Sequence, residues 1–214
     1  MMQDAPPPVV MVQDEPRHHP VFHHSTVRIL DVQIPPGDVT LYHTHDTAIL
    51  YVPISISPTD TQILGQEWLG VKPADRSRFE GLVVATDTSY ASRPLTHRVK
   101  NVGDRLFRLI AITNAATPEA VATKSPPGRL VHASPWYSAT QLTIAPQADS
   151  EWATAAAPTV VVLPGTGRVR VERDRETTPL IAPGAWAYIE VGQRYRITNA
   201  SVGATAVVLV QANL

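Results

Sequence analysis

The chain of 214 residues contains no cysteine, which excludes disulfide bonds, thiolate metal ligands and cysteine nucleophiles and leaves the redox compartment open. Charge is also scarce, because Asp, Glu, Lys and Arg make up 17% of the residues and the formal net charge is −1. A protein that binds nucleic acid or an anionic membrane usually carries a basic run or patch, and none is visible here. We therefore expect neither a nucleic-acid nor a membrane partner.

Long apolar runs are missing as well. No stretch approaches the roughly 20 residues of a membrane span. Residues 1–20 carry Asp4, Asp14, Glu15 and three consecutive prolines, and they lack the basic start and apolar region of a signal peptide. We expect a soluble cytoplasmic protein.

A helical period sustained over twelve residues is also hard to find, whereas short β patterns recur throughout. Residues 27–34 alternate apolar with polar side chains, and further strands are expected at residues 39–45, 48–56, 61–69 and 80–86. Many short strands with Gly, Pro, Asp and Ser between them are typical of a sandwich or barrel. The sequence predicts an all-β fold.

The two halves of the chain echo each other. Residues 97–101 and 195–199 share the frame aromatic, Arg, aliphatic, any residue, Asn, and each precedes a turn and an apolar strand. We interpret this as two tandem copies of one β unit. The expected organisation is an extended N-terminal arm at 1–20, a first unit at 21–115, a linker at 116–135 and a second unit at 136–214.

The spacing of the histidines is the most specific indication of a functional site in the sequence. His43 and His45 lie in an expected strand, so alternation places both imidazoles on one face. With His97 from another strand, they form a facial set for one divalent transition metal. The pairs His18-His19 and His23-His24 cannot chelate through both rings on one strand, and we expect them at the surface, with His23 or His24 at a barrel mouth as an alternative. His132 falls in the linker and is expected to be exposed.

These residues resemble the cupin superfamily. Its first motif has a glycine, five residues and His-x-His, which Gly37 and residues 43–45 fit, and its second motif ends in a histidine and an asparagine four residues later, which His97 and Asn101 fit. The resemblance implies a double-stranded β-helix barrel in which the three histidines hold one metal. The family glutamate would fall at Ile49 or Leu50, so the site resembles three-histidine cupins such as thiol dioxygenases and β-diketone-cleaving dioxygenases.

Further residues are expected to line the pocket. Ile49 and Leu50 would keep one side of the metal dry, and strand alternation places Leu41 on the same face as His43 and His45. Glu67 is a candidate for an extra ligand or acid–base group. The second half resembles a cupin without ligands, because residues 147–155 match residues 37–45 in order but contain no histidine, and Tyr195 stands in place of the third ligand.

The expected protein is thus a bicupin with a metal-binding first barrel and a metal-free second barrel. The leading hypothesis is a mononuclear Fe(II) dioxygenase acting on a small chelating diketone, organic acid or thiol. One alternative is a non-redox isomerase, lyase or hydrolase with Zn(II), Mn(II) or Ni(II). Another is a non-enzymatic small-molecule-binding or scaffold cupin with a structural metal. The resemblance also implies a homodimer.

Overall fold

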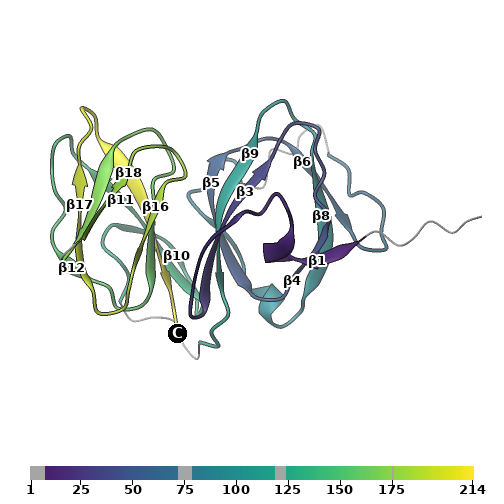
Figure 1. The fold of residues 1–214 in the computed structure, drawn as a ribbon, viewed down its shortest axis with the longest axis horizontal. Coiled ribbons are helices and arrows are strands. Elements are labelled where there is room, and N and C mark those ends of the chain that lie inside the picture. Colours follow the sequence, from purple (N-terminus) through teal and green to yellow (C-terminus); the bar gives the residue numbers. More distant parts are fainter. Residues whose placement is uncertain (1–7, 72–78, 119–123, 175) are drawn as a thin grey trace, which may run out of the picture.

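The computed structural model describes residues 8–71, 79–118, 124–174 and 176–214, which form two β-barrels side by side, each built from two sheets (Figure 1). The four-stranded sheet of the N-terminal barrel contains, in spatial order, β1 (Val9–Met11), β4 (Tyr42–His45), β8 (Leu95–Asn101) and β6 (Thr59–Ile63). Its five-stranded sheet contains β2 (Pro20–His24), β3 (Val27–Ile34), β9 (Phe107–Asn114), β5 (Ala48–Ser55) and β7 (Ala85–Asp87).

The C-terminal barrel repeats this plan. Its five-stranded sheet contains β10 (Arg129–Ala133), β11 (Tyr137–Ile144), β18 (Thr205–Ala212), β13 (Thr159–Val162) and β16 (Trp186–Ile189). Its four-stranded sheet contains β12 (Ala153–Thr154), β17 (Arg194–Asn199), β14 (Val169–Arg173) and β15 (Glu176–Leu180). The prediction of an all-β fold with two tandem barrels is confirmed.

Strand ends follow local turn chemistry. The strand expected at 61–69 ends at Ile63 because Gly65 turns the chain with φ +78°. The strand expected at 80–86 is reduced to β7, which follows a turn containing Gly81 at φ +73°. The helical elements among the described residues are the short 3-10 turns η1 (Val12–Asp14) and η2 (Ser89–Ala91).

The N-terminal segment, described from residue 8 onward, belongs to the first barrel. Its strand β1 pairs in parallel with β4, and β2 pairs antiparallel with β3. Between them, Val12 and His18 are buried. Residues 1–7 lie outside the described part. In the region expected as a linker, β10 is an edge strand of the C-terminal barrel.

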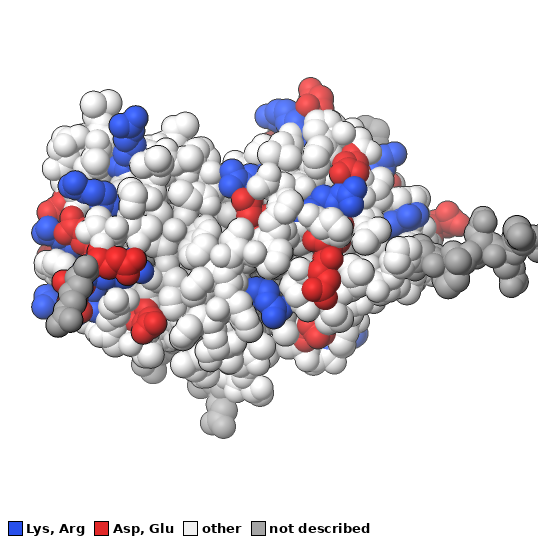
Figure 2. Space-filling view, in the orientation of Figure 1, with Lys and Arg blue, Asp and Glu red and all other residues white. Residues whose placement is uncertain are grey.

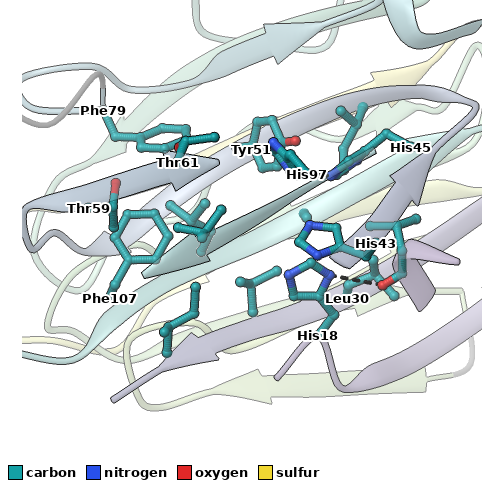
Figure 3. A pocket seen from close by; sticks show the side chains of 17 residues that line it. His18, Leu30, His43, His45, Tyr51, Thr59, Thr61, Phe79, His97 and Phe107 are labelled. Atoms are coloured by element: carbon teal, nitrogen blue, oxygen red, sulfur yellow. Dashed lines mark hydrogen bonds between the residues drawn. The ribbon is translucent and has the colours of Figure 1, made fainter. Parts of the chain in front are cut away.

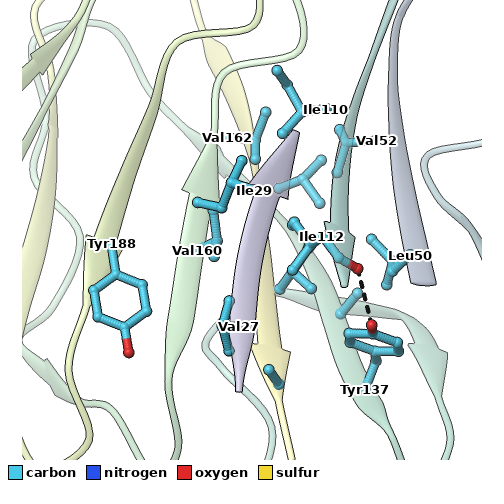
Figure 4. Close-up of a cluster of buried hydrophobic side chains, with 14 of the residues drawn as sticks. Val27, Ile29, Leu50, Val52, Ile110, Ile112, Tyr137, Val160, Val162 and Tyr188 are labelled. Atoms are coloured by element: carbon cyan, nitrogen blue, oxygen red, sulfur yellow. Dashed lines mark hydrogen bonds between the residues drawn. The ribbon is translucent and has the colours of Figure 1, made fainter. Parts of the chain in front are cut away.

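The two five-stranded sheets pack against each other and form a core shared by both barrels (Figure 4). Ile29 and Ile112 come from the first barrel, and Val160 and Val208 come from the second; all four are at most 1% exposed. Burying such side chains contributes about 1.5–3 kcal/mol each relative to exposure. The buried hydroxyl of Tyr137 crosses the junction and donates to the carbonyl oxygen of Ile112 at 2.9 Å.

Acidic and basic side chains are interspersed on the face shown in Figure 2, and a largely uncharged band covers the middle of that face. This distribution agrees with the low net charge of the sequence. Among the described residues, no helix has the length and apolarity needed to cross a membrane.

Candidate metal centre

The three predicted histidines meet inside the N-terminal barrel (Figure 3). His43 of β4 pairs directly with His97 of β8, and His45 lies two residues further along β4 on the same face. One ring nitrogen from each lies within 4.8 Å of the other two, and the ring centroids are 4.7–5.1 Å apart. Strand pairing and alternation therefore bring together residues that are more than fifty positions apart in the sequence.

Hydrogen bonding orients the imidazole of His43. Its Nδ1 lies 2.9 Å from the carbonyl oxygen of Leu41, which can only accept, so Nδ1 donates and Nε2 is left for the site. Burial, reinforced by the nearby His18, lowers the pKa of His43 from 6.5 to about 3. The ring is therefore neutral at physiological pH, and neutral imidazole is the form that binds metal.

The donor set fits one divalent transition metal. Nε2 of His45 and Nε2 of His97 face each other at 3.1 Å, and both His43 and His45 are buried. Imidazoles suit Fe, Zn, Cu and Ni ions, and three of them on one side leave coordination positions for substrate. The group that converges among the described residues contains histidines and no carboxylate.

A cavity of about 80 Å³ extends from the histidines into the barrel. Apolar side chains dominate its walls, including those of Ile49, Phe79 and Phe107, while Thr59 and Thr61 supply hydroxyl groups at the end away from the histidines (Figure 3). Among the described residues that line it, none is Lys, Arg, Asp or Glu. Any charge on a bound ligand must therefore be balanced at the metal end.

Solved structures share this architecture. AerE from Microcystis aeruginosa has a TM-score of 0.61 at 11% identity, and the match covers 94% of this chain and 99% of that one. A cupin 2 conserved barrel domain protein from Leptotrichia buccalis has a TM-score of 0.53 at 12% identity, covering 91% and 87%. The fold is a cupin fold. A salicylate 1,2-dioxygenase from Pseudaminobacter salicylatoxidans has a TM-score of 0.58 at 10% identity, covering 87% and 71%.

No family model matches the sequence, and no curated protein matches it either. Identities near 10% support the cupin fold alone, so the chemistry has to be argued from the site. The resemblance inferred from Gly37, the three histidines and Asn101 is confirmed for the fold, and a metal cupin is the class of protein that the site supports.

The other predicted pocket residues have different positions. Ile49 lines the cavity, but its neighbour Leu50 points to the opposite face of β5 and packs in the core between the barrels. Leu41 is not among the lining residues, because β4 begins at Tyr42 and the alternation does not extend back to it. Glu67 is exposed in the loop after β6 and is not part of the converging group.

His18 is a pocket residue that the sequence prediction placed at the surface. It is 5% exposed, lines the cavity and meets the ring of His43 edge-on at 4.5 Å between centroids. Its Nδ1 is 2.9 Å from the carbonyl oxygen of Val12, and burial lowers its pKa to about 4. The apolar run at residues 9–12 could have indicated this position. Such a run is unusual in a solvent-exposed arm, and it belongs to the partly buried segment that leads to His18.

A buried carboxylate fixes that segment next to the site. Glu15 is 1% exposed and accepts hydrogen bonds from the backbone N–H of Arg17 at 2.6 Å and of Leu41 at 3.1 Å. Arg17 forms a two-pronged pair with Asp38 at 2.8 and 2.9 Å. These bonds tie the N-terminal segment to the loop that leads into β4, so the segment is part of the pocket wall.

The remaining histidines lie away from the pocket. His19, His23 and His24 are exposed, and Nδ1 of His24 lies 3.2 Å from the hydroxyl of Tyr188 in the second barrel. His132, expected to be exposed, is half-buried, and this burial lowers its pKa.

In the second cupin barrel, Ala153 pairs with Tyr195 in the register in which His43 pairs with His97. Two residues after Ala153, Ala155 occupies the position of His45. The structural counterpart of the metal site therefore carries two alanines and a tyrosine.

Proposed function

We propose that this protein is a metal-dependent cupin enzyme, and specifically a dioxygenase that uses Fe(II) to oxidise a small organic acid, diketone or thiol. His43, His45 and His97 would hold the ion. When bound, Fe(II) supplies a Lewis acid for the substrate donor atoms and an electron source for activating oxygen. The observation that carries the proposal is the convergence of three histidines on a small, mainly apolar cavity.

The histidines would act as neutral ligands. Because they bring no negative charge, the full double charge of the ion remains available to an anionic substrate. The cavity walls offer no cationic side chain among the described residues, so an enolate, carboxylate or thiolate would be attracted to the metal end alone. This arrangement favours substrates that place their charged group on the metal and their apolar body against Ile49 and Phe107.

The apolar walls exclude water from the substrate. Leu30, Ile49 and Leu109 are each at most 3% exposed and line the cavity. A dry pocket strengthens electrostatic interactions and limits hydrolysis of reactive species. Its volume of about 80 Å³ restricts the substrate to a small molecule.

The test is anaerobic loading with Fe(II) followed by measurement of oxygen uptake with salicylate, pentane-2,4-dione and cysteamine. We expect consumption with at least one probe and incorporation of oxygen atoms from ¹⁸O₂ into the product. The His97→Ala variant should lose both metal and uptake, while His23→Ala, which removes an exposed histidine, should keep both. Absence of uptake with all three probes in protein that holds one Fe per chain would contradict the proposal.

A second candidate is non-redox chemistry with Zn(II), Mn(II) or Ni(II), in which the metal activates a substrate for isomerisation or bond cleavage. The observation that favours it is His18, an additional imidazole in the pocket that could carry a proton. Protein that retains zinc, consumes no oxygen and loses turnover on His18→Phe substitution would support this candidate over the first.

A further inference from the structure

The C-terminal barrel contains a larger cavity than the metal pocket. Its volume is about 380 Å³, and it is lined by residues of β12, β13, β17 and β18 and of the segment at 124–127. Ligand pockets commonly have volumes of roughly 300–1,000 Å³. The cavity lies at the mouth of the barrel that has no histidine ligands.

The cavity occupies the structural counterpart of the metal site. Ala153, Ala155 and Tyr195 line it, and these are the residues that replace the three histidines. Thr159 faces it as well, and its pairing with Gln211 matches the pairing of Ile49 with Thr113 in the first barrel. Ala153 and Ala155 are smaller than His43 and His45, which stand at the corresponding positions. The second barrel therefore has open space where the first barrel has imidazole rings.

Three polar side chains deep in the cavity are almost completely buried: Thr159, Tyr195 and Gln211 are 1–2% exposed. Among the described residues, no hydrogen bond involves the hydroxyl of Tyr195. Burial raises the pKa of Tyr195 to about 12, so the phenol keeps its proton. The hydroxyl of Tyr195 is not one of the enclosed polar atoms that lack a partner, so a molecule in the cavity can reach it and accept its hydrogen bond.

The rim of the cavity supplies charge and an aromatic surface. Lys124 is the one charged side chain among the described lining residues, and it is exposed. Trp152 also lines the cavity and is 44% exposed, and the guanidinium groups of Arg194 and Arg196 each lie 5.2 Å from the centre of its ring system. The part of the indole that lines the cavity offers an apolar contact to a flat ligand body whose anionic group reaches the ammonium of Lys124.

We propose that this cavity is a second ligand site, independent of the metal, for a small aromatic carboxylate with an oxygen atom at its far end. The carboxylate pairs with Lys124 at the rim, the ring lies against Trp152, and the inner oxygen accepts a hydrogen bond from Tyr195. The site goes beyond the proposed dioxygenase function, because it contains no metal ligands and lies in the other barrel.

The probe is 4-hydroxybenzoate, titrated by calorimetry into the full chain. Two analogues separate the contacts, since benzoate lacks the far oxygen and 4-hydroxybenzamide lacks the charge. We expect 4-hydroxybenzoate to bind more tightly than either analogue by roughly three- to tenfold, the usual effect of one hydrogen bond or one partly exposed ion pair.

Variants assign the contacts. Tyr195→Phe keeps the ring and should abolish the preference over benzoate, while Lys124→Ala should abolish the preference over the amide. Ala153→Leu fills the cavity and should prevent binding without changing the metal content of the first barrel. His97→Ala should leave the affinity unchanged, which separates this site from the metal pocket.

Loss of binding in His97→Ala protein would overturn the proposal, because the probe would then be a ligand of the metal site. Unchanged affinities in both Tyr195→Phe and Lys124→Ala would overturn it as well. So would the absence of saturable binding of all three probes to the native chain.

Discussion

Asn101 in the first barrel and Asn199 in the second share three hydrogen bonds. The side-chain amide of each donates to the carbonyl at the end of an earlier strand, Ile34 or Ile144, and to the carbonyl four residues further along the chain. The amide oxygen of each accepts from the backbone N–H two residues later. Both side chains are fully buried, so each asparagine locks the turn before the last strand of its barrel.

We expect Asn101→Ala and Asn199→Ala each to lower the free energy of unfolding by about 2–4 kcal/mol, because buried carbonyl and N–H groups lose their partners. Urea denaturation followed by tryptophan fluorescence measures this change. The control is Val202→Ala, at a side chain that is 97% exposed in the corresponding turn. A loss below about 1 kcal/mol for both asparagine variants would show that the turns hold without them.

Ile49 and Leu50 are adjacent in β5, and the same substitution at each should have different effects because one lines the metal pocket and the other lies in the core. Ile49→Glu places a carboxylate in the metal pocket, where we expect metal affinity to rise by at least about tenfold because an anion joins three neutral ligands. Leu50→Glu buries a charge in the core between the barrels and should cost more than about 4 kcal/mol. Chelator competition and urea denaturation measure the two effects, and equal destabilisation of both variants would contradict the assignment of faces.

Metal removal should lower thermal stability. An ion present at 100 times its dissociation constant stabilises the folded state by about 2.7 kcal/mol, which corresponds to roughly 5–10 °C in Tm for a chain of this size. Scanning calorimetry before and after dialysis against a chelator tests this expectation. His97→Ala protein should show no difference between the two conditions, and an equal shift in that variant would place the stabilising ion elsewhere.

Glu15 should determine how firmly the N-terminal segment is held. Glu15→Ala removes the acceptor for the N–H groups of Arg17 and Leu41, at a cost of about 2–3 kcal/mol. We expect faster amide hydrogen exchange in β1 and weaker metal retention, since the segment carries His18 into the pocket wall. Glu67→Ala, at an exposed carboxylate, is the matched control and should change neither quantity.

The ion pair between Asp38 and Arg17 should make the free energy of unfolding fall as the solution becomes acidic. Hydrogen bonds from Arg17 hold the pKa of Asp38 below its ordinary value of 3.8, so the unfolded chain binds more protons as the solution becomes acidic. The pair therefore contributes stability above about pH 5 and loses it as the pH falls through the folded-state pKa. Both side chains are partly exposed, which limits the effect to below about 1 kcal/mol.

The measurement is the difference in unfolding free energy between wild type and Asp38→Asn as a function of pH. This difference should shrink below pH 4, and a difference that grows there would contradict the assignment.

Strand alternation, a local pattern, predicts that His43 and His45 share one face. His97 lies more than fifty positions away, and the resemblance to the cupin motifs supplied both it and Asn101. Alternation also predicts that Ile49 and Leu50 face opposite sides, so only one of them can line a pocket. His18 could not be placed in this way, since its position depends on the parallel pairing of β1 with β4, whose residues lie more than thirty positions apart. Glu67 was misplaced because the turn at Gly65 ends β6 early.

The core shared by the two five-stranded sheets has a consequence for how the chain folds. Ile29, Leu50 and Ile112 would face solvent if the first barrel stood alone, and Val160 and Val208 would do so in the second. Neither half can therefore be separated without exposing a broad aliphatic surface that favours aggregation. The C-terminal barrel therefore keeps the apolar face of the metal-binding barrel out of water, and we expect the two barrels to unfold together.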